Sequence, residues 1–95
     1  MHIKVSDEAA EWFKNEYEIE DEISLRFFVR YGGVGGNVPG FSLGVNFDPP
    51  TTIHTSVTVN DVLFYIEESD AWYFDGKDLI VSLNHDLDEP QFTYK

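Results

Sequence analysis

Hydrophobic and polar residues alternate in two runs near the middle of the chain. The first run covers residues 23–31 and the second covers residues 41–47. Successive side chains of a strand point to opposite faces, so a period of two predicts a strand in each run. Because the runs flank a glycine-rich segment, we expect an antiparallel pair with that segment as a long, irregular connection.

A helical pattern precedes these runs. Ala9, Phe13 and Tyr17 recur at intervals of four, which places them on one face of a helix. Ser6 stands before the pattern as an N-cap, since its hydroxyl can accept a hydrogen bond from a first-turn amide. We predict an amphipathic helix over residues 7–17, after a short strand at residues 2–5.

The rest of the chain reads as short strands separated by turns. Extended patterns cover residues 51–59, 62–66, 79–83 and 91–94, residues 67–70 can form a single helical turn, and residues 84–90 read as a loop. The order of elements predicts a mainly β domain of the α+β class with one N-terminal helix packed on it. We expect residues 1–95 to form a single domain.

Charge narrows the classes of partner. The chain has 18 acidic and 6 basic residues, for a formal net charge of −12. Such a charge repels nucleic acids and anionic membrane surfaces, so we expect a protein partner. The chain has no cysteine, which excludes disulfides and thiolate metal sites. No apolar run has the length of a membrane span or a signal peptide, and we expect a cytoplasmic protein.

The glycine-rich loop, residues 30–40, is the main candidate site. It holds five of the seven glycines and no acidic residue. Glycine allows a backbone to approach a ligand closely. The candidate binding residues are Arg30, Tyr31, Gly32, Gly33, Val34, Gly35, Gly36 and Gly40. The alternative is that the glycines serve only the geometry of the connection. The loop lacks the third spaced glycine and the following helix of a dinucleotide site.

A second candidate is a metal site. Imidazole and carboxylate ligands are available from His85, Asp86 and Asp88, with His54 as a further ligand. The run lacks the spacing of a calcium loop, so a solvated turn is the alternative. Serines occur outside any nucleophile-elbow context, and no cofactor motif is present, so we expect no enzyme activity.

Four segments together resemble a known family. They are Val5-Ser-Asp-Glu-Ala-Ala10, Leu25-Arg-Phe-Phe-Val-Arg30, Phe41-Ser-Leu-Gly-Val-Asn-Phe47 and Phe74-Asp-Gly-Lys-Asp-Leu79. Their order resembles the HesB/IscA-like, or A-type, iron–sulfur biosynthesis family, in its cysteine-free branch. The resemblance implies a twisted β-sandwich or pseudo-barrel of seven or eight short strands.

The chain departs from that family at the cysteines. Val34 stands about where the carriers have the first cysteine, and the printed sequence ends at Lys95 without their Cys-Gly-Cys segment. We therefore expect no iron–sulfur cluster and no other cofactor. The resulting hypothesis is a non-enzymatic accessory protein with a protein partner, which the resemblance links to iron–sulfur or metal metabolism. Self-association is a further expectation. The alternative is a metal-ion or small-ligand-binding module built on His85, Asp86, Asp88 and the glycine-rich loop.

Overall fold

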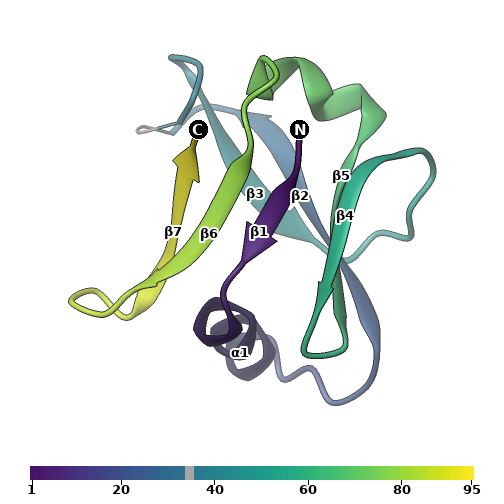
Figure 1. The fold of residues 1–95 in the computed structure, drawn as a ribbon, viewed down its shortest axis with the longest axis vertical. Helices are drawn as coiled ribbons and strands as arrows, with labels where there is room; N and C mark the ends of the chain where they lie inside the picture. Colours follow the sequence, from purple (N-terminus) through teal and green to yellow (C-terminus); the bar gives the residue numbers. More distant parts are fainter. Residues whose placement is uncertain (34–35) are drawn as a thin grey trace.

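The computed structural model describes residues 1–33 and 36–95, and Figure 1 shows its course. Within these residues, seven strands and two helical segments follow one another. They are β1 (Ile3–Val5), α1 (Asp7–Glu16), β2 (Ile23–Tyr31), β3 (Phe41–Asn46), β4 (Ile53–Val59), β5 (Val62–Glu67), the 3₁₀ helix η1 (Glu68–Phe74), β6 (Leu79–Asn84) and β7 (Glu89–Tyr94). None of the helices in this part of the chain is long and apolar enough to span a membrane.

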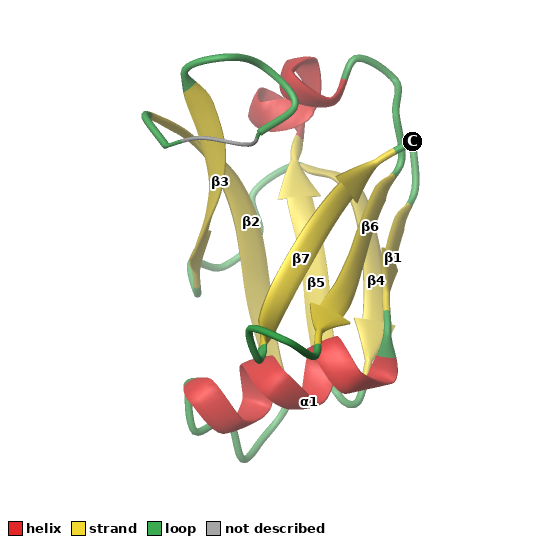
Figure 2. Ribbon diagram, turned by 90° about the vertical axis from the view of Figure 1, so that its left-hand side faces the viewer, coloured by secondary structure: helices red, strands yellow, loops and turns green. Residues whose placement is uncertain are grey.

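The strands form two mixed sheets. One has the order β1-β6-β7 and the other has the order β3-β2-β5-β4. The pairs β1–β6 and β2–β5 are parallel, and the other neighbours are antiparallel. In Figure 2, α1 lies across one end of the strands, while η1 lies at the opposite end, on the same side as the glycine-rich loop. The predicted α+β class, with an N-terminal helix on a mainly β body, is confirmed.

The helix forms where its pattern and cap predict. Ser6 has extended backbone angles, and its hydroxyl oxygen accepts a hydrogen bond from the Ala9 amide at 3.0 Å. Ala9, Ala10 and Phe13 are buried on the face that turns toward the strands. Burial of this apolar face, more than intrinsic propensity, stabilises a helix of only ten residues.

Aromatic rings from both sheets and the helix meet in the core. The Phe13 ring lies 5.9 Å from that of Phe27 and 5.7 Å from that of Phe64. Phe27 also contacts Phe92 of the other sheet, with 5.5 Å between ring centroids. Phe13, Phe27 and Phe64 are almost completely buried. These contacts hold the two sheets and α1 together.

The predicted pairing around the glycine-rich loop is confirmed. β2 and β3 are antiparallel, with Tyr31 opposite Phe41 at the loop end and Arg26 opposite Asn46 at the other end. Two local predictions differ from the structure. The last strand begins earlier, so that Pro90 lies inside β7 opposite Leu83. An edge strand tolerates proline because one row of its backbone groups has no strand to bond. The predicted helical turn at residues 67–70 extends to residue 74 as η1.

Polar side chains on the outer face of the four-stranded sheet form hydrogen bonds to neighbouring segments of the chain. Arg26 donates to the Asp70 carboxylate at 2.8 Å, which ties β2 to η1. The buried carboxylate of Glu67 accepts hydrogen bonds from the amides of Thr51 and Thr52 at 2.7 and 2.8 Å. The segment between β3 and β4 is thereby fixed over this face.

Candidate functional site

The base of the glycine-rich loop is closed by its own backbone. The Gly32 amide donates to the Gly40 carbonyl at 2.7 Å. Both residues have positive φ, +107° and +84°, which a side chain would disfavour. Arg30 donates through Nε to the Ser42 hydroxyl at 3.0 Å, across the β2–β3 pair. Glycine is thus needed at the base of the loop for backbone geometry, whether or not the loop binds a ligand.

The second half of the loop is attached to η1 through Asn37. The Asn37 amide donates to the Tyr73 hydroxyl at 2.6 Å, and its side-chain amide donates to the Tyr73 carbonyl at 2.7 Å. Lys77 donates to the Asn37 side-chain oxygen at 3.2 Å. Three hydrogen bonds to one asparagine give this side of the loop a defined position beside the 3₁₀ helix.

Gly36 lies next to this attachment and has no room for a side chain. A Cβ atom at Gly36 would overlap both the Phe41 carbonyl oxygen and the Tyr73 hydroxyl. At Gly33 a Cβ would come within 2.5 Å of the Ser42 hydroxyl. The glycines at these two positions therefore permit close packing of the loop on β3 and η1. Val34 and Gly35, also predicted as binding residues, lie outside the described residues.

Three aromatic side chains next to the loop form an exposed surface, which we call the aromatic surface: Tyr31, Phe41 and Trp72. Tyr31 is 88% exposed and Trp72 is 54% exposed. The Phe41 ring lies between them, 5.7 Å from the ring of Tyr31 and 5.4 Å from that of Trp72, and both contacts are edge-to-face. The pairing of β2 with β3 brings Tyr31 to Phe41, and η1 adds Trp72.

The aromatic surface continues inward to the buried Tyr73 and the half-buried Tyr94. Trp72 contacts Tyr73, whose hydroxyl lies 3.3 Å from that of Tyr94. Burial, followed by the hydrogen bond to Tyr73, raises the pKa of Tyr94 well above its ordinary value. The Tyr94 hydroxyl thus stays protonated at neutral pH and serves the structure rather than acid–base chemistry.

The predicted metal ligands lie at separate places. His85 contacts Glu8 at the start of α1, with 2.7 Å between Nε2 and the carboxylate. His54 contacts Glu68 of η1 at 3.0 Å. α1 and η1 lie at opposite ends of the molecule (Figure 2).

The two predicted aspartate ligands lie in the turn between β6 and β7. The amide of Asp86 donates to the Asn84 side chain, and the Asp88 carbonyl accepts a hydrogen bond from Trp12. In residues 1–33 and 36–95, no three His, Asp or Glu side chains are grouped so that they could hold a metal ion. Metal binding stays a prediction.

Sequence reasoning missed Phe41 and Trp72 as surface residues. Trp72 lies in an apolar run of four residues, and such a run predicts burial. The 3₁₀ helix turns three residues of this run inward or partly inward, but it turns Trp72 to the surface. A 3₁₀ segment of seven residues has no strong sequence signature, so the pattern alone could not have revealed this exposure.

Comparison with known proteins shows the family. The chain is 44% identical to the pyruvate dehydrogenase inhibitor of Bacillus subtilis over 95 residues, the full length of both proteins. An uncharacterised protein of Staphylococcus haemolyticus is 36% identical over 90% of this chain and 91% of its own. A protein of Staphylococcus aureus is 36% identical over the whole of both chains. This chain belongs to the family of small bacterial proteins that contains these relatives. No protein-family model matches it, and no solved structure matches it.

The predicted membership of the HesB/IscA-like family is wrong. No model of that family matches, and a full-length relative has an unrelated name. The four segments behind the resemblance were a capped helix start, two alternating strands and a turn. Many β-rich proteins share such features for reasons of backbone geometry alone. The implied link to iron–sulfur or metal metabolism loses its support with the resemblance.

The coarser part of the functional prediction stands. A relative that is named as an inhibitor of an enzyme supports an accessory protein that acts through a protein partner.

Proposed function

We propose that this protein is a non-catalytic inhibitor that binds pyruvate dehydrogenase through the aromatic surface and the adjoining glycine-rich loop. The observation that carries the proposal is the 44% identity to the Bacillus subtilis inhibitor along the full length of both chains. Identity at this level without any gap in coverage supports a shared fold and a shared kind of partner.

The aromatic surface has the composition of an interface centre. Tyrosine, tryptophan and arginine are enriched among the residues that contribute most to protein binding. Tyr31 and Trp72 are exposed here, and Arg30 lies next to Tyr31 with its side chain bonded to Ser42. Large rings with few rotatable bonds contribute contact area at a low cost in conformational entropy.

The loop beside these rings is partly pre-organised. Gly32 and Gly40 close its base, and Asn37 fixes it to Tyr73. Since binding must otherwise order a loop, a loop that is already held loses less conformational entropy. Arg30, Tyr31, the loop glycines and Val34 are therefore proposed as part of the interface, with Phe41 and Trp72 added to them.

The experiment measures the activity of purified pyruvate dehydrogenase during titration with this protein. We expect saturable inhibition, together with a complex that is detectable by isothermal titration calorimetry at the same stoichiometry. Inhibition without this protein being consumed or modified, as judged by mass spectrometry, would support the non-catalytic role. If neither inhibition nor binding occurs at a large molar excess, the proposal is wrong.

The metal- or small-ligand-binding alternative has less support. His85 and His54 each contact one glutamate, and those glutamates lie on α1 and η1. Because a ligand that binds only the folded state raises its stability, thermal unfolding with added Zn²⁺, Mn²⁺, Ca²⁺ or Mg²⁺ tests this alternative. A rise in melting temperature that disappears in His85→Ala would revive it.

A further inference from the structure

A groove of about 690 Å³ lies on the outer face of the four-stranded sheet, away from the aromatic surface. Its floor is formed by Ser24 of β2, Leu63 of β5 and Thr58 of β4, which stand side by side because Leu63 is the register partner of both others. The same sheet buries Leu25 and Phe64 on its other face. The floor is therefore made by strand pairing and is as rigid as the sheet.

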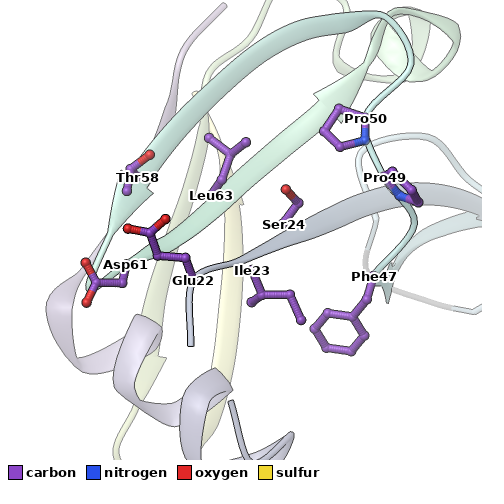
Figure 3. A pocket seen from close by; sticks show the side chains of 9 residues that line it. All are labelled: Glu22, Ile23, Ser24, Phe47, Pro49, Pro50, Thr58, Asp61 and Leu63. Carbon is purple, nitrogen blue, oxygen red and sulfur yellow. The ribbon is translucent and has the colours of Figure 1, made fainter. Parts of the chain in front are cut away.

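One wall of the groove is apolar. Phe47, Pro49 and Pro50, from the segment that follows β3, line it (Figure 3). Phe47 is 38% exposed, and its ring contacts that of Tyr17 at 5.2 Å. Exposed prolines and a half-exposed phenylalanine offer an apolar surface with little conformational freedom to lose on binding.

Buried polar groups hold this wall in place. The Tyr65 hydroxyl donates to the Asp48 carbonyl, and the Glu67 carboxylate accepts from the Thr51 and Thr52 amides. These two hydrogen-bonding groups flank the two prolines, one on each side. The wall thus exists before any partner arrives.

Two carboxylates stand at one end of the groove. Figure 3 shows Glu22 and Asp61 at the same end, across from the apolar wall. Within the described residues neither carboxylate forms an ion pair, and none of the residues that line the groove is basic. Asp61 has a φ of +67° in the tight turn between β4 and β5, where glycine would be less strained.

We propose that this groove binds an extended segment of a partner protein that carries a lysine or arginine beside apolar residues. The basic side chain would lie between Glu22 and Asp61, and its apolar neighbours would contact Phe47 and the two prolines. Charge complementarity argues for this occupant, because neither acid forms an ion pair within residues 1–33 and 36–95, and the net charge of −12 attracts basic partners. Within the described residues, no three His, Asp or Glu side chains are grouped here so that they could hold a metal ion. The inference rests on the proposed function in one respect, that the protein has a protein partner.

The test uses short peptides and does not need the enzyme. The capped peptide acetyl-Ala-Leu-Lys-Leu-Pro-Ala-amide is titrated into ¹⁵N-labelled protein, and a matched peptide has glutamate in place of lysine. We expect the amide signals of Ser24, Thr58 and Leu63 to shift with the lysine peptide only. Since one exposed ion pair and a few apolar contacts contribute modest free energy, the dissociation constant should be on the order of 1 mM.

Two variants remove the carboxylates. Glycine adopts the positive φ of this turn without strain, so Asp61→Gly should have a melting temperature equal to or higher than that of the parent. Glu22→Gln changes an exposed side chain. Each variant should raise the dissociation constant of the lysine peptide by about twofold to fivefold, and the double variant should raise it further. Glu16→Gln, the control, removes one exposed charge from α1 outside the groove and should have no effect.

Three results would overturn the inference: no shift of the groove amides, equal shifts with both peptides, or equal weakening by Glu16→Gln. These results are separate from the enzyme titration. Peptide binding without inhibition of pyruvate dehydrogenase would support the groove as a binding site and contradict the proposed function. Inhibition without peptide binding would support the proposed function and contradict the groove as a binding site.

Discussion

At the scale of single residues, the buried Glu67 carboxylate has the clearest physical consequence. Its hydrogen bonds from the Thr51 and Thr52 amides lower its pKa below the ordinary value of 4.5, the Thr51 bond having the largest effect. A carboxyl group with a lowered pKa in the folded state stabilises the fold at pH values above its unfolded pKa. That stabilisation is lost as the pH falls from about 4.5 toward the folded pKa.

The lowered pKa of Glu67 predicts how its replacement affects stability at different pH values. Glu67→Gln should lower the free energy of unfolding by about 1.5–3 kcal/mol at pH 7, because hydrogen bonds to a charged acceptor are lost. The difference from the parent should shrink when both proteins are unfolded with urea at pH 3. Glu20→Gln, which changes an exposed side chain outside this network, is the control. A difference that stays the same at both pH values would contradict the assigned role.

Single residues also show where sequence reasoning ends. Ser6 could be predicted as an N-cap because its bond to Ala9 is local. The positions of Trp72 and Asp61 depend on a 3₁₀ helix and on a turn whose surroundings come from distant strands. The residue type alone does not indicate which distant segments will surround a side chain.

At the scale of elements, the joint between the glycine-rich loop and η1 is the feature to test. Tyr73→Phe removes the hydroxyl that accepts from the Asn37 amide at 2.6 Å. Leaving that half-buried donor without a partner should lower the free energy of unfolding by about 1 kcal/mol. Faster hydrogen exchange at the Asn37 amide should accompany the loss.

Tyr94→Phe is the matched control for this joint. It removes only the longer contact of 3.3 Å to Tyr73 and leaves Asn37 bonded. Hydrogen exchange at Asn37 should therefore stay near the parent value. Equal protection in both variants would show that Tyr73 does not hold the loop.

Elements differ in how far the sequence predicts them. β2 and β3 follow from strict alternation, which needs no knowledge of distant contacts. β7 was predicted to begin at residue 91, after Pro90, whereas the edge position of β7 in its sheet makes the proline acceptable inside the strand. The order of strands in the two sheets joins β1 to β6 and β2 to β5, and no local pattern indicates these parallel pairings.

At the scale of the whole molecule, one core holds both sheets and α1. Phe64 is completely buried and stacks on Phe27 at 5.7 Å. Phe64→Ala should lower the free energy of unfolding by about 3–5 kcal/mol, as lost burial combines with a cavity. Urea unfolding measures this loss, and Leu87→Ala, at an exposed side chain, should change stability by less than about 0.5 kcal/mol. A loss below about 1 kcal/mol for Phe64→Ala would contradict the assigned core.

The two proposed binding surfaces lie in different parts of the molecule. The aromatic surface lies beside the glycine-rich loop, while the acidic groove lies on the outer face of the four-stranded sheet. Tyr31 was predicted as a binding residue, but neither surface could be predicted as a whole, because Trp72 and the strands under the groove come from elements that are far apart in the sequence. The glycine-rich loop could be predicted from composition, because five of its eleven residues are glycine.

Inhibition of pyruvate dehydrogenase by surface variants tests whether the aromatic surface binds the enzyme. The double variant Tyr31→Ala with Trp72→Ala removes the two most exposed rings of the aromatic surface and leaves the core intact. Since residues at the centre of an interface contribute about 2 kcal/mol or more, the inhibition constant should rise by about thirtyfold or more. Leu87→Ala, which removes an exposed apolar side chain outside the aromatic surface, should inhibit like the parent. Unchanged inhibition by the double variant, folded as judged by its melting temperature, would contradict the claim that this surface binds the enzyme.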